Sequence, residues 1–149
     1  MKRAYEKRYW PFVLWLIALV VGMIGSAELA NRAGLSGRGM TAASMMALIL
    51  LLAALFVMIW KGEYVYWISG GPDYDQAKAA GSEHRRAYAW LHFRAMLLGG
   101  LVALAVLAVE YCCGTNELTM ILSVGACVVA AAVSTTRIHW TEERKEKET

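Results

Sequence analysis

Four long apolar stretches constrain what this chain can fold into. They cover residues 10–30, 40–60, 91–112 and 118–136, and each contains few charged side chains. An α-helix rises about 1.5 Å per residue, so roughly 20 residues cross the ~30 Å hydrocarbon core of a bilayer. Each stretch has about this length. The sequence therefore predicts an all-α integral membrane protein whose four spans form a four-helix bundle, as a single domain over residues 1–149.

The basic residues predict the orientation of the spans. Lys and Arg are retained on the cytoplasmic side of short loops during insertion. Of the 15 Lys and Arg residues, all but Arg32 and Arg38 belong to the side of the two termini and of the loop 61–90. We therefore expect both termini and this loop to be cytoplasmic, with the helices running up-down-up-down. The expected location is a membrane of the bacterial cytoplasmic (inner) type.

The aromatic residues give an independent indication of the same side. Trp and Tyr prefer the headgroup level of a membrane, because their rings have an apolar body and a polar tip. All six Trp residues lie at or near the predicted cytoplasmic ends of the spans, whereas the opposite ends have only Tyr111. These Trp residues are Trp10, Trp15, Trp60, Trp67, Trp90 and Trp140.

The loop 61–90 is the longest polar segment. The second helix is predicted to continue through Glu63 and Trp67 and to stop at Gly70, where two glycines precede a proline. A short amphipathic helix should follow, capped by Asp73 or Asp75 and ended by Gly81. Ser82 is expected to cap the helix that leads into the third span.

Two interpretations of this loop remain open. It is either a surface segment that lies on anionic inner headgroups through its arginines, or a docking surface for another protein, because Tyr, Trp and Arg are enriched at interface hot spots. The predicted partner or lipid contacts are Trp67, Tyr74, Arg85, Arg86 and Tyr88.

Two acidic residues in the apolar stretches are candidates for an ion or substrate site, since charges inside membranes are costly. Glu28 follows Trp10 by roughly 27 Å along a helix, and Glu110 follows Trp90 by roughly 30 Å. Both are therefore predicted at the outer interface, where helix-end solvation accounts for them and a cation or proton site is the alternative. They are free to pair with each other or with Arg32 or Arg38.

Histidines and cysteines supply no strong motif. His92 and His139 have similar predicted depths, so a shared haem is conceivable, but interfacial side chains are the favoured interpretation. Cys112, Cys113 and Cys127 form no C-x-x-C or zinc-type pattern. We expect no metal site, no cofactor and no catalytic residue.

Small residues recur at four-residue spacing on three of the predicted helices. Gly22, Ser26 and Ala30 lie on the first, Gly99 and Ala103 on the third, and Ala126 and Ala130 on the fourth. Such spacing lets two helices approach closely in lipid. It predicts packing within one chain, with contact between copies as the alternative.

Together these patterns predict a small non-enzymatic membrane protein that acts as an accessory, regulatory or immunity-type subunit. The expected partners are membrane lipid and another membrane protein or further copies of the chain, and nucleic acid is not expected. The alternative is a homo-oligomeric transporter or channel for a small cation or amphiphile. The charged tail 141–149 is predicted to be solvated.

Overall fold

A computed structural model describes residues 5–140 of the chain. Its described residues contain helices and no strands. The elements in chain order are α1 (Trp10–Arg32), α2 (Gly37–Gly62), the 3-10 helix η1 (Val65–Trp67), α3 (Tyr74–Ala79), α4 (Ser82–Cys113) and α5 (Glu117–Thr135). The four long helices match the four predicted spans, and the expectation of an all-α protein is confirmed.

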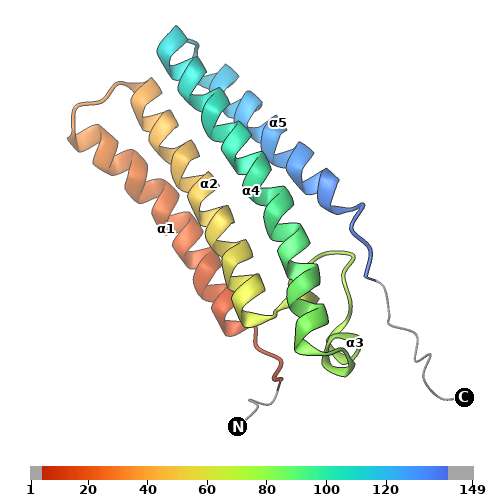
Figure 1. Ribbon diagram of the computed structural model, residues 1–149. Helices are drawn as coiled ribbons and strands as arrows, with labels where there is room; N and C mark the ends of the chain where they lie inside the picture. The colour runs from red at the N-terminus through yellow and green to blue at the C-terminus, as the bar shows by residue number, and fades with distance from the viewer. Residues whose placement is uncertain (1–4, 141–149) are drawn as a thin grey trace, which may run out of the picture.

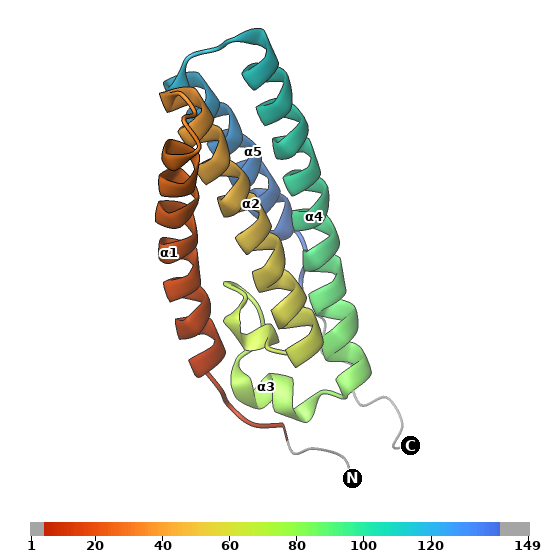
Figure 2. The ribbon, with the colours of Figure 1, turned by 90° about the vertical axis from the view of Figure 1, so that its left-hand side faces the viewer.

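The long helices lie side by side, and each runs opposite to the one before it (Figure 1). α2, α4 and α5 pack around one buried cluster, and α1 joins this group through α2. α1 packs mainly against α2, α2 against α4 and α4 against α5, with a smaller contact between α2 and α5. Figure 2 shows α1 at one edge, with α2 between it and α4. Most of the surface of α1 is therefore left without a protein neighbour.

The exposed surface of the long helices is strongly apolar. The apolar window of α1 contains no buried residue, and Val21, Ile24 and Leu29 are each more than 60% exposed. A protein in water does not normally leave such large contiguous apolar surface uncovered. All four helices are long and apolar enough to cross a membrane. The structure thus indicates an integral membrane protein whose outer surface contacts lipid.

Two buried clusters hold the helices together. The first joins α2, α4 and α5 through Ile49, Ala103, Leu107, Met120 and Val124. The second lies at the opposite end and joins α2, η1, α3 and α4; its buried members are Ile59, Val65, Ala77, Tyr88 and Ala89.

Small residues allow two of the helix contacts, as their spacing predicted. A Cβ atom added at Gly99 of α4 would lie 2.3 Å from the Cβ of Ala131 in α5. One added at Gly22 of α1 would lie 2.8 Å from Leu51 in α2. Both glycines therefore serve packing within the chain. Ala126 and Ala130 are exposed instead.

The loop after α2 departs from its predicted course. α2 ends at Gly62, because Glu63 adopts a left-handed conformation (φ 58°) that interrupts the helix before Trp67. The expected short helix is present as α3, and Asp73 caps it by accepting a hydrogen bond from the Gln76 N–H at 2.7 Å. Ser82 was predicted to cap α4, but the N-cap residue is Gly81.

Candidate functional site

Segments from four parts of the chain meet at one end of the helices. We call this region the cap: residues 5–9, 63–81 and 136–140, together with the first turns of α4. Its rings pack closely, with Tyr64 stacked on Trp67 at 4.3 Å between centroids and Trp140 edge-on to Tyr88 at 5.1 Å. The aromatic residues predicted to share one interface thus lie together at this end.

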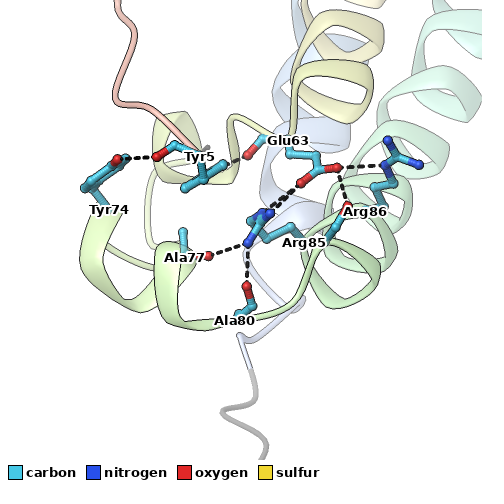
Figure 3. A network of polar contacts seen from close by, with 8 residues as sticks. Tyr5, Glu63, Tyr74, Ala77, Ala80, Arg85 and Arg86 are labelled. Carbon is cyan, nitrogen blue, oxygen red and sulfur yellow. Dashed lines mark hydrogen bonds and ion pairs between the residues drawn. The ribbon is translucent and has the colours of Figure 1, made fainter. Parts of the chain in front are cut away.

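Arg85, in the first turns of α4, is the centre of the cap (Figure 3). The residue is only 7% exposed. Its guanidinium donates to the carbonyl oxygen of Ala77 at 2.9 Å and to that of Ala80, at the end of α3. Its Cζ also lies 4.1 Å from the centroid of the Tyr5 ring, within the range of a cation–π contact. One side chain therefore connects α4, α3 and the segment that precedes α1.

Glu63 provides the negative charge that a buried arginine requires. Its Oε2 accepts from Arg85 Nε at 2.9 Å and Nη2 at 2.7 Å. Its Oε1 accepts from Arg86 Nε at 2.9 Å and from the Ser82 hydroxyl. The hydroxyl that was expected to cap α4 thus contributes to this carboxylate instead.

The surroundings of Glu63 keep its carboxyl ionised. Burial alone would raise its pKa, but the hydrogen bonds from Ser82 and Arg85 and the charges of Arg85 and Arg86 outweigh this effect. The pKa therefore lies below its ordinary value. A carboxylate with so many donors is a poor proton acceptor, so this arrangement holds segments together and is unsuited to acid–base catalysis.

Tyrosine hydroxyls attach the N-terminal segment to the cap. Tyr5 donates to the Glu63 carbonyl oxygen at 2.8 Å, and Tyr74 donates to the Tyr5 carbonyl oxygen at 2.8 Å. Tyr66 accepts from the Arg8 N–H at 2.8 Å and donates to the Arg8 carbonyl oxygen at 2.9 Å. Burial raises the pKa of Tyr5 and of Tyr66.

The residues predicted as partner or lipid contacts divide into two groups. Arg85 and Tyr88 are buried, so their side chains hold the cap from inside and do not reach its surface. Trp67 and Tyr74 are half-buried, and Arg86 is exposed with its side chain 61% accessible. The exposed cations Lys61 and Lys78 were not among the predicted contacts, although they lie on the same part of the chain.

Sequence reasoning also missed Glu63, Ser82 and Tyr5. Glu63 was expected inside a longer α2, and its carboxylate is one of several acidic groups in the loop 61–90. The only signal for it was the adjacent Gly62, which favours a helix end nearby. A prediction from hydropathy alone continues the helix through that glycine, because the apolar run resumes at Val65.

The two acidic candidates at the opposite end are engaged separately. Glu28 accepts from Arg32 Nε at 2.8 Å, one turn along α1. Glu110 accepts from the Ser123 hydroxyl at 2.6 Å, between α4 and α5. No ion pair or hydrogen bond joins the two in the part of the chain that the structure describes. Arg38 donates to the Tyr111 carbonyl oxygen at 2.6 Å.

Polar groups within the spans bond mainly to backbone carbonyls. Trp15 Nε1 donates to Leu51 O at 2.8 Å, and Ser26 donates to Met23 O at 2.8 Å. His92 is 2% exposed, with its Nδ1 3.1 Å from Tyr88 O, whereas His139 is exposed. Among residues 5–140, no group of three His, Cys, Asp or Glu side chains has the arrangement of a metal site.

The free cysteines lie apart from the cap. Cys112 and Cys113 are exposed at the end of α4, and Cys127 is half-buried in α5.

Comparison of the chain with family models, curated proteins and solved structures finds no match. Its function must therefore be inferred from its own geometry.

Proposed function

We propose that this protein is a non-enzymatic subunit of a membrane complex that binds another membrane protein through the exposed face of the cap. Its role would be accessory, regulatory or of the immunity type. The observation that carries the proposal is the Glu63–Arg85 ion pair, which gives the loop 63–81 a fixed shape. A loop that only connected two spans would not need a buried arginine with three separate acceptors.

Cations on the exposed face of the cap favour an acidic partner segment, although the carboxylates of Asp73, Asp75 and Glu83 are exposed in the same region. Lys78 and Arg86 are exposed on it, Lys61 is exposed beside it in the last turn of α2, and among these three cations only Arg86 is engaged by Glu63. A rigid backbone loses little conformational freedom when the side chains that it carries bind a partner. An acidic segment next to a transmembrane helix of another protein would complement this charge.

The same cations support an orientation. Basic residues next to spans favour the cytoplasmic side, so we place the cap and both termini there. The outer ends of the helices then carry the turns 33–36 and 114–116. A membrane of the bacterial inner-membrane type remains our proposed location.

The transporter alternative receives less support. Its two proposed carboxylates, Glu28 and Glu110, have separate partners on different helix pairs. Trp15 and Ser26 within the spans donate to backbone carbonyls, and the polar contact at Glu110 is limited to Ser123, with the second carboxylate oxygen of Glu110 buried without a partner. Flux through reconstituted vesicles nevertheless tests this alternative directly.

Site-specific photo-crosslinking tests the proposed contact. A photoreactive residue replaces Lys78 on the cap in cells that make the protein, and a matched control replaces Arg32 at the opposite end. We expect position 78 to crosslink to one discrete chain of a different protein, and position 32 not to do so. Crosslinks only between copies of this chain, together with flux that is lost in Glu110→Gln, would overturn the proposal in favour of a transporter.

A further inference from the structure

An apolar groove lies between α2 and α4, in the half of the molecule that is away from the cap. Its volume is about 330 Å³, and its lining includes Gly39, Ala43, Met46, Leu104, Ala108 and Tyr111. Ala43 and Ala108 contribute only methyl groups and leave the space open, whereas the Leu35 side chain fills the space beside Gly39. Neither α1 nor α5 contributes a lining residue, and the neighbouring Leu50 is 57% exposed. The groove therefore faces the hydrocarbon of the membrane.

A cation lies at the end of this groove. The Arg38 guanidinium lies over the ring of Tyr111, with 5.5 Å between Cζ and the ring centroid, and donates to the Tyr111 carbonyl oxygen. Arg38 forms no ion pair with any carboxylate of residues 5–140, unlike Arg8, Arg32, Arg85 and Arg86.

The nearby acidic side chains form no ion pair with this cation. Glu117 lies against Gly37, where an added Cβ atom would be 2.2 Å from its Oε1, and Glu110 accepts from Ser123. Neither carboxylate is paired with Arg38. The Nε of Arg38 is buried without a hydrogen-bond partner. Of the five guanidinium N–H groups, one on Nη2 donates to the Tyr111 carbonyl oxygen, and the other Nη donors, rather than the buried Nε, remain for an external anion.

We propose that the groove binds one acyl chain of a glycerophospholipid whose phosphate is held by Arg38. Arg is suited to phosphate because its planar donors can form paired hydrogen bonds. The groove extends along α2 from Gly39 to Met46, which is roughly 10 Å or a third of the hydrocarbon core. This length suits the upper part of an acyl chain that descends from a headgroup at the level of Arg38.

The dimensions argue against a helix as the occupant. A transmembrane helix is about 10–12 Å across with its side chains and packs along most of a span. The groove is too short for such a contact, and a helix seated there would leave Arg38 without an anion. A phospholipid satisfies the apolar lining and the cation together.

Native mass spectrometry of delipidated protein tests this proposal with two matched lipids. Palmitoyl-oleoyl phosphatidylglycerol carries the phosphate, and palmitoyl-oleoyl glycerol has the same chains without it. We expect one phosphatidylglycerol to bind per chain, and the glycerol lipid to bind about tenfold more weakly. Arg38→Gln should reduce phosphatidylglycerol binding to a similar extent, and Arg38→Lys should restore part of it.

Two control variants separate a site from general lipid adhesion. Ala108→Leu fills the groove and should abolish the retained lipid, whereas Ala105→Leu adds the same side chain on the exposed surface of α4 outside the groove lining. Arg32→Gln removes an exposed cation from α1 at the same end and should have no effect. Equal binding of the two lipids, or unchanged binding in Arg38→Gln, would overturn the proposal. A lipid-free dimer that Ala108→Leu dissociates would also overturn it.

Discussion

Arg85 and Glu63 form a nearly buried ion pair across the junction of α2 and α4, with 2.7 Å between Nη2 and Oε2. The two side chains are only 9% and 13% exposed. Removal of one member leaves the other charge buried without compensation, which is far more costly than the loss of a surface pair. The pair therefore decides whether the loop 63–81 keeps its shape.

Glu63→Gln should release the cap. We expect the free energy of local opening of residues 63–81 to fall by about 3 kcal/mol, because Arg85 loses its counter-charge. Hydrogen exchange followed by mass spectrometry measures this opening in detergent. Glu83→Gln is the matched control, since Glu83 is exposed near the start of α4 and has no part in the ion pair. Equal protection of the loop in wild type and Glu63→Gln would show that the ion pair does not hold the cap.

The two arginines that contact Glu63 should differ in their effect. Arg86 has a side chain 61% exposed, so Arg86→Gln should destabilise the cap by less than about 1 kcal/mol. Arg85→Gln should cost several times more, because it also removes the donors to Ala77 and Ala80. The same exchange measurement compares them, and similar losses in both variants would contradict the central place of Arg85.

Acid should loosen the cap through Glu63. Its pKa in the folded protein is lowered from the ordinary value of 4.5, so its contribution to stability is present above that value and is lost as the pH falls through the folded pKa. Below about pH 4.5, hydrogen exchange at the amides of residues 63–81 should therefore be faster than its intrinsic dependence on pH predicts. Glu63→Gln should show a smaller acid effect. An identical pH profile in this variant would assign the effect to other groups.

The helix contact at Gly99 should not tolerate a methyl group. Gly99→Ala places a Cβ against Ala131, and the helices must separate to accept it, at a cost of about 1–3 kcal/mol. Gly125→Ala is the control, because an added Cβ there meets nothing within 4 Å. Denaturation by sodium dodecyl sulfate in mixed micelles compares the two. Equal stability of the two variants would show that α4 and α5 are not in close contact at Gly99 and Ala131.

Labelling of the native cysteines tests the orientation. Cys112 and Cys113 are exposed at the helix ends opposite the cap. With the cap in the cytoplasm, a membrane-impermeant maleimide should label them in intact cells once any outer membrane is permeabilised. Cys113→Ala combined with Cys112→Ala should abolish the label. Labelling that requires rupture of the membrane enclosing the cytoplasm would place the cap outside.

Much of the fold is predictable because hydropathy acts over many residues at once. The four spans depend on long apolar runs, and the N-cap of α3 at Asp73 depends on a local hydrogen-bonding preference. The end of α2 depends on the backbone conformation of one residue, Glu63, for which the sequence offers only the neighbouring glycine. Apolar residues after Glu63 favoured a longer helix, so the predicted end of α2 was wrong.

The contacts inside the cap were harder to predict from the sequence. Arg85 and Arg86 are adjacent and chemically identical, yet one is buried and the other exposed. Which of them turns inward depends on where α4 begins and on its contacts with α3. The partners of Glu28 and Glu110 similarly depend on which helices are neighbours, because α1 contacts mainly α2 whereas α4 contacts both α2 and α5.

Native mass spectrometry of the complex extracted gently from its own membrane tests the central claim most directly, because it weighs partners, copies and retained lipid together. We predict a different chain bound at fixed stoichiometry, and its loss in the charge-reversed variant Lys61→Glu with Lys78→Glu but not in Arg32→Glu. Recovery of only this chain, as a homo-oligomer unaffected by these changes, would contradict the proposed subunit function.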